Sequence, residues 1–98
     1  MAYSIDFSED AERHLSLMTA RDRGIVLDAI DRQLAHEPTV PTRHRKLLRQ
    51  NPLASWELRV GQFRVFYNVE DDRAAVVIVA IGVKVHNVLS IDGKSYQL

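Results

Sequence analysis

Two arginines face each other across a predicted β-hairpin, and this pair is the first place in the chain where we expect chemistry. Residues 56–69 read WELRVGQFRVFYNV, two alternating runs around a Gly-Gln pair, which is typical of two strands joined by a tight turn. With the Gly-Gln pair as a two-residue loop, Arg59 lies opposite Arg64. Like charges that face each other on a sheet are destabilising, so the two guanidiniums require an anion. That anion is either a neighbouring carboxylate such as Glu57 or a phosphate from outside.

Basic residues gather before and within this hairpin. Between residues 43 and 64 a single carboxylate stands against six basic side chains, which are Arg43, Arg45, Lys46, Arg49, Arg59 and Arg64. The whole chain has thirteen basic and thirteen acidic residues and a formal net charge of zero, whereas nucleic-acid-binding domains are usually basic overall. The sequence therefore predicts a neutral protein with one basic face. The group at 43–49 is either a phosphate-binding surface, as its charge allows, or a solvated loop.

Composition restricts the classes of protein that remain. Ninety-eight residues, of which 46% are hydrophobic, are enough for one domain with one core, so we expect a single domain over residues 1–98. The absence of cysteine excludes disulfides and thiolate metal sites and suits a reducing cytosol. We see no P-loop, nucleophile elbow or metal-ligand spacing, and expect neither cofactor nor metal. No signal peptide and no apolar run of about 20 residues is found, so we expect a cytoplasmic protein without a membrane anchor.

Periodicity predicts the elements that must position the basic groups. In chain order they are a strand at 3–7, a helix capped by Ser8 and running through 18, a helix from about 20 to 35 capped by Thr19, a short strand or turn at 46–48, the hairpin, and a strand at 74–81. The last strand is continuously apolar, which indicates a central strand covered on both faces. Gly82 is expected to break it. The tail 83–98 either adds an edge strand or packs as a loop.

Side-chain patterns predict the core. The expected helix stripes are Ala11, Leu15 and Met18, then Val26, Ile30 and Leu34, widened by Leu27 and Ala29. Trp56 and Tyr67 are expected to be cross-strand neighbours in the core, and His14 and His36 to lie on the surface. The order β-α-α-β-β-β predicts an α+β domain, in which two N-terminal helices pack on one side of a mainly antiparallel sheet of about four strands. Alternation then places Arg64 on the open face of that sheet, where its charge meets either a ligand or a carboxylate.

Together with the order of elements, the motifs WELRVGxFRVFY and AIGxK resemble the RelE/ParE superfamily of bacterial toxins. The resemblance extends from the opening YxIxFS to Lys84. It implies the toxin of a type II toxin–antitoxin pair. Members that resemble RelE cleave messenger RNA in the ribosomal A site, and members that resemble ParE poison DNA gyrase. Both are silenced by a co-encoded antitoxin that wraps the toxin.

The resemblance also implies site residues. RelE-type sites use arginines and lysines on the sheet, with a tyrosine or histidine beyond the last strand; carried over by position, these fall on Arg64, Lys84 and His86. Arg59 is a candidate second phosphate contact, and Arg43, Arg45, Lys46 and Arg49 are the candidate RNA-binding residues. RNA cleavage requires a base for the 2′-hydroxyl, cations for the developing charge and an acid for the leaving oxygen. Arg64 is our candidate for charge stabilisation and His86 for proton transfer.

The chain departs from the RelE pattern at three places. The two lysines expected on the strand before the hairpin turn fall on Ser55 and Glu57, and the nearest tyrosine after Lys84 is Tyr96. We expect a ribosome-dependent, metal-independent endoribonuclease that inhibits translation, with messenger RNA, the ribosome and a cognate antitoxin as partners. The alternative is a ParE-like gyrase inhibitor without catalysis, which the missing lysines and the zero net charge favour. A third reading is a degenerate member that only binds its antitoxin.

Overall fold

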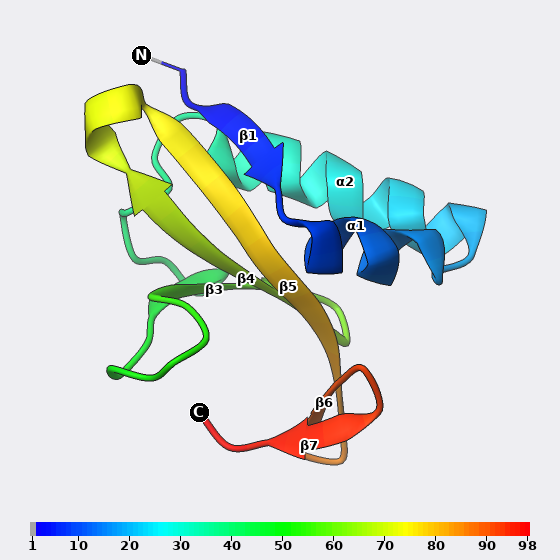
Figure 1. The fold of residues 1–98 in the computed structure, drawn as a ribbon. Helices are drawn as coiled ribbons and strands as arrows, with labels where there is room; N and C mark the ends of the chain where they lie inside the picture. Colours follow the sequence, from blue (N-terminus) through cyan, green and yellow to red (C-terminus); the bar gives the residue numbers. More distant parts are fainter. Residues whose placement is uncertain (1) are drawn as a thin grey trace.

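In the computed structural model, which describes residues 2–98, two helices lie against one face of a twisted sheet (Figure 1). The elements are β1 (Ser4–Phe7), α1 (Glu9–Ser16), α2 (Ala20–Leu34), β2 (Arg45–Leu47), β3 (Trp56–Val60), β4 (Phe63–Glu70), the 3₁₀ turn Asp71–Arg73, β5 (Ala75–Val85), β6 (Val88–Ile91) and β7 (Lys94–Tyr96). The predicted α+β architecture is confirmed, but the sheet has seven strands and not about four. Neither helix has the length and apolar character that a membrane-spanning helix requires.

Two of the three additional strands, β6 and β7, are possible because Gly82 does not end β5. The strand order is β2-β3-β4-β5-β6-β7, all antiparallel, with β1 parallel to the first half of β5. A Cβ atom at Gly82 would lie 2.8 Å from both the Ile91 Cγ1 atom and the Ser90 carbonyl oxygen. The glycine is therefore a point where β6 comes close to β5, a common reason for glycine inside a strand. The prediction that Gly82 breaks the strand was wrong, and the tail forms β6 and β7.

The central hairpin has the predicted register. Arg59 pairs with Arg64 and Trp56 with Tyr67 across β3 and β4. Gly61 has a φ of 58°, the positive value that the first position of a type II′ turn requires. The rings of Trp56 and Tyr67 stack in the helix-facing core with their centroids 6.1 Å apart. Burial raises the pKa of Tyr67, so the phenol keeps its proton and donates a 2.7 Å hydrogen bond to the Pro38 carbonyl.

A bulge in β5 lets one apolar strand serve two cores. Phe66 pairs with Ala80 but Tyr67 pairs with Ile78, so Val79 has no partner on β4. Ile78 and Ile81 consequently both face the helices, while Ala80 and Phe66 face away from them. The predicted central strand is confirmed. The face away from the helices is not open, because it carries a second apolar cluster of Ala54, Phe66, Ala80, Leu89 and Ile91.

The helices begin where their caps predict. The hydroxyls of Ser8 and Thr19 accept hydrogen bonds from the third residue beyond each, and α1 ends at Ser16 and not at Met18. The helix-facing core contains Ala11, Leu15, Val26, Ala29, Ile30 and Leu34, with Met18 packed at its edge. Leu27 was wrongly placed in this core, since it is 37% exposed.

His14 is a buried residue of α1, which corrects its predicted surface position; His36 is exposed as predicted. The His14 Nδ1 atom accepts a 3.0 Å hydrogen bond from the Ile81 backbone N–H, so the ring proton is on Nε2. Nε2 donates to the Asp92 carboxylate at 2.9 Å. The side chain therefore links α1 to β5 and to the turn between β6 and β7.

We expect Gly82→Ala to lower the free energy of unfolding by about 1–3 kcal/mol, because the new methyl group forces β6 away from β5. Gly24→Ala is the matched control. Gly24 lies inside α2 with no atom within 4 Å of the Cβ position, so this change should stabilise by about 0.5–1 kcal/mol. Urea denaturation of both variants measures the difference. Equal effects would mean that the close approach at Gly82 is unimportant.

The Asp92 contacts predict a pH dependence of stability. The hydrogen bond from His14 lowers the pKa of Asp92 in the folded protein, and Arg13 lowers it further. The stabilisation is therefore complete above the unfolded-state pKa and is lost as the pH falls through the lower folded-state pKa. Asp92→Asn keeps an oxygen acceptor but removes the charge. We expect it to be less stable than the unmodified chain at pH 6 and equally stable near pH 2; a gap that persists at pH 2 would contradict this assignment.

Candidate functional site

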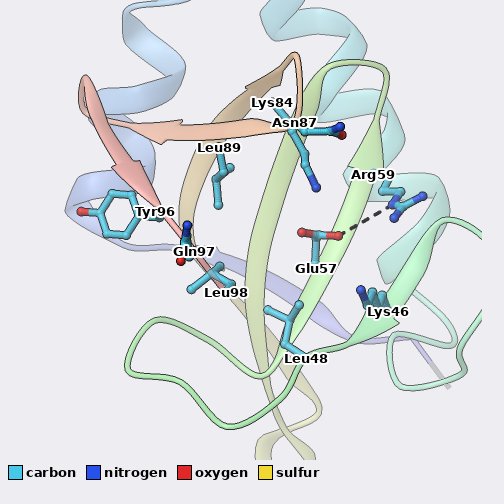
Figure 2. A pocket seen from close by; sticks show the side chains of 10 residues that line it. All are labelled: Lys46, Leu48, Glu57, Arg59, Lys84, Asn87, Leu89, Tyr96, Gln97 and Leu98. Atoms are coloured by element: carbon cyan, nitrogen blue, oxygen red, sulfur yellow. Dashed lines mark ion pairs between the residues drawn. The ribbon is translucent and has the colours of Figure 1, made fainter.

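A hollow of about 230 Å³ lies on the sheet face that points away from the helices (Figure 2). We call it the cationic hollow. Its lining residues come from β2 and β3 on one side and from the end of β5, β6, β7 and the last residues on the other. They are Lys46, Leu48, Glu57, Arg59, Lys84, Asn87, Leu89, Tyr96, Gln97 and Leu98.

Strand register explains why these residues meet. Lys46 pairs with Glu57 across β2 and β3, and Arg59 follows two residues later on the same face of β3. On the other side, Lys84 pairs with Leu89 across β5 and β6. The β5–β6–β7 meander thus brings the C-terminal residues next to a hairpin far away in the sequence.

Three cations surround one largely buried carboxylate in the cationic hollow. Glu57 is 9% exposed, and its carboxylate lies 3.8 Å from the Arg59 guanidinium. Figure 2 shows the side-chain ends of Lys84 and Arg59 directed toward Glu57, with Lys46 on the β2 side. A single carboxylate leaves the surrounding positive charge in excess. Such a site suits a phosphate, held by the cations beside a group that can accept a proton.

Arg64 lies next to the cationic hollow but does not line it. Its Nη1 atom donates to the carbonyls of Gly61 at 2.8 Å and Phe63 at 2.9 Å, and its Nε atom is buried without a hydrogen-bond partner among residues 2–98. The two arginines of the pair therefore have different partners. The Glu57 carboxylate lies near Arg59, whereas backbone carbonyl oxygens accept hydrogen bonds from Arg64. The catalytic role of Arg64 stays a prediction.

His86 is exposed at the turn between β5 and β6 and does not line the cationic hollow. Of the predicted catalytic residues, the structure brings Arg59 and Lys84 together in the cationic hollow. The role of His86 in proton transfer also stays a prediction.

The predicted RNA-binding group is dispersed. Lys46 lines the cationic hollow, whereas Arg43 and Arg49 are exposed outside it. Arg45 points to the other face, where its Nε donates to the Val40 carbonyl at 2.8 Å and its Nη1 to the Gln33 carbonyl at 2.6 Å. These contacts tie β2 to the end of α2, so Arg45 has a structural role. RNA binding by the group stays a prediction.

Sequence reasoning missed Glu57 and Asn87 as lining residues of one site. It treated Glu57 only as an ion-pair partner, although the alternation with Arg59 already placed both on one face. Asn87 carried no signal, because its position depends on the β5–β6 turn that was not predicted. Among residues 2–98, no three histidine or acidic side chains are gathered as a metal site would require.

Comparisons with known proteins give a matching family and a solved structure with a similar fold. A family model described as the ParE toxin of the type II toxin–antitoxin system, parDE, matches residues 5–84. Among solved structures, the chain is similar to one in the crystal structure of the toxin–antitoxin complex RelBE2 from Mycobacterium tuberculosis. The TM-score is 0.74 and the identity 26%, covering 86% of this chain and 93% of that chain. A search of curated proteins finds no match.

The excess charge predicts that Glu57→Gln will bind phosphate-bearing ligands more tightly than the unmodified chain, because the nearby negative charge is removed. We expect a several-fold increase in affinity for tripolyphosphate at low salt, which weakens as salt screens the charges. Isothermal titration at two salt concentrations measures it. Glu70→Gln is the control, since Glu70 is exposed and pairs with Arg73 outside the cationic hollow. An unchanged or lower affinity in Glu57→Gln would contradict the assignment of an anion site.

Proposed function

Because this chain belongs to the ParE toxin family of type II toxin–antitoxin systems, we propose that it is a toxin that cleaves messenger RNA on the ribosome. The observation that supports cleavage is the buried carboxylate of Glu57 among Lys46, Arg59 and Lys84. This set joins a proton acceptor and phosphate-binding cations in one hollow. It provides what RNA cleavage requires with the 2′-hydroxyl of the substrate as nucleophile.

The proposed reaction begins when the Glu57 carboxylate takes the proton from a ribose 2′-hydroxyl. The 2′-oxygen attacks the adjacent phosphorus, and Lys46 and Arg59 stabilise the charge that develops on the phosphoryl oxygens. The bond to the 5′-oxygen of the next nucleotide breaks, and the Lys84 ammonium supplies a proton to that oxygen. The products are a 2′,3′-cyclic phosphate and a free 5′-hydroxyl. Glu57 then returns its proton to Lys84 through solvent.

The proposed partner that prevents this reaction is a cognate antitoxin. The similar chain from Mycobacterium tuberculosis was crystallised in a toxin–antitoxin complex. An antitoxin segment that places carboxylates near Lys46 and Arg59 would neutralise the cations and exclude the RNA phosphate. Such local attraction fits a chain whose formal net charge is zero.

The second candidate is a gyrase inhibitor without catalysis. The ParE description of the matching family supports it, as does the occurrence of Glu57 where RelE-like members are expected to carry a lysine. In that case the cationic hollow is a binding surface and Glu57 has no chemical role.

A degenerate member that only binds its antitoxin would leave cell growth unaffected.

One experiment separates these functions: the chain is induced without an antitoxin, and translation, message cleavage and plasmid supercoiling are followed. We expect cleavage of ribosome-bound message only. Glu57→Gln should lower the cleavage rate by about 10²- to 10⁴-fold, the usual contribution of a general base, although it binds phosphate more tightly. If Glu57 had only a structural role, Glu57→Gln would lower both the cleavage rate and the affinity for phosphate.

The control for this experiment is Glu70→Gln, which should cleave as the unmodified chain does. Loss of supercoiling with intact message would replace the nuclease proposal by gyrase inhibition. Normal growth at matched expression would support the degenerate reading.

A further inference from the structure

A second hollow lies where the C-terminal half of α2 passes the end of β3. Its volume is about 310 Å³, and we call it the α2–β3 groove. Arg32 and Gln33 line it from α2, and His44 and Arg59 line it from the sheet side. Among residues 2–98, no carboxylate lines this groove, whereas Glu57 lines the cationic hollow. The polar side chains of the groove therefore suit an anion.

Arg45 adds a positive charge directly behind the α2–β3 groove. Its Nη1 atom donates to the Gln33 carbonyl at 2.6 Å and to the Gln33 side-chain oxygen at 3.3 Å, and its Nε atom donates to the Val40 carbonyl. These partners are neutral oxygens, so no ion pair with them cancels the charge. The contact also orients the Gln33 amide. Because its oxygen accepts from Arg45, its NH₂ group is the end left for a ligand.

Arg32 and Arg59 are only partly neutralised by their own ion pairs. The Arg32 guanidinium lies 3.0 Å from the Asp28 carboxylate, and both side chains are largely exposed. An exposed pair of this kind is weak, so Arg32 can turn to a ligand at little cost. The Arg59 guanidinium is 3.8 Å from Glu57, beyond hydrogen-bond distance. The groove therefore has positive charge in excess.

Arg59 connects the α2–β3 groove to the cationic hollow, because it lines both. Its backbone N–H donates to the His44 carbonyl at 2.8 Å, which holds His44 beside it. Figure 2 shows the Arg59 side chain at the boundary of the cationic hollow, joined to Glu57 by the ion pair. A polyanion in the cationic hollow can therefore continue past Arg59 into the groove along a positively charged surface.

We propose that the α2–β3 groove binds a second phosphate of the RNA strand whose scissile phosphate lies in the cationic hollow. This inference rests on the proposed RNA substrate. Guanidinium groups and the amide NH₂ group donate hydrogen bonds, which phosphate oxygens accept. The groove lacks the carboxylate that we propose as the base for cleavage. It is thus a binding subsite that sets the path of the strand, and not a second cleavage site.

The test is binding of fluorescein-labelled 2′-O-methyl hexauridylate, which lacks the 2′-hydroxyl and cannot be cleaved, followed by fluorescence anisotropy at several salt concentrations. Arg32→Gln and Asp28→Asn break the same exposed ion pair, so α2 loses the same contact in both variants. We expect opposite effects on affinity: Arg32→Gln lowers it several-fold, and Asp28→Asn raises it. In Arg32→Gln the fall of log K with log salt should be less steep by about 0.7, the value for one phosphate contact on a single strand.

The matched control is Arg21→Gln, because Arg21 is exposed on the same helix but lines neither the groove nor the cationic hollow. It should bind as the unmodified chain does, and isothermal titration should give one hexanucleotide per chain. The inference is overturned if the unmodified chain does not bind the probe or binds two strands. It is also overturned if Arg32→Gln binds as well as Arg21→Gln, or if the Arg32 and Asp28 variants change affinity in the same direction.

The cleavage assay described above distinguishes this failure from failure of the proposed function. Message cleavage with equal affinities of Arg32→Gln and Arg21→Gln removes the groove from the RNA path and leaves the nuclease. Opposite effects of Arg32→Gln and Asp28→Asn without message cleavage leave the groove as an RNA site and remove the nuclease. If Arg32→Gln weakens only the complex with the antitoxin, the groove binds antitoxin carboxylates and the RNA inference is overturned.

Discussion

The close approach of β6 to β5 at Gly82 is the constraint on which the cationic hollow depends. Because Gly82 has no side chain, Leu89 and Ile91 can pack into the cluster around Phe66. That packing holds the β6–β7 meander against the sheet face away from the helices. Without it, the C-terminal residues could not face Lys46 and Glu57, and the hollow would be a flat basic surface.

The two apolar clusters have different roles in the domain. The cluster under the helices is the larger and contains Trp56, Tyr67 and the buried faces of α1 and α2. The smaller cluster supports the hollow. The bulge at Val79 allows β5 to contribute to both, and the Ser8 hydroxyl that caps α1 also donates to the Val79 carbonyl at 2.7 Å. This hydrogen bond fixes the start of α1 to the bulge in β5.

What could be predicted from the sequence was set by local signals. Ser8 and Thr19 fixed the helix starts, and the Gly-Gln pair fixed the register that places Arg59 opposite Arg64. The errors occur where the deciding partner is distant in the chain. Gly82 suggests a break unless the later strand β6 is known.

The same limit applies to buried polar groups and to the site. His14 suggests a surface residue because Ile81 and Asp92, which satisfy its ring nitrogens, follow much later. The basic residues were recognised, but alternation alone could not separate Lys46, which lines the hollow, from Arg45, which anchors α2.

The parallel pairing of β1 with β5 also has a kinetic consequence. During synthesis, Ser4 of β1 can pair with Ala75 of β5 only after Ala75 has left the ribosome. Pairing between residues so far apart in the chain slows folding. The hollow is also lined by Tyr96 of β7, so it cannot form on a nascent chain before β7 has been synthesised and has paired with β6.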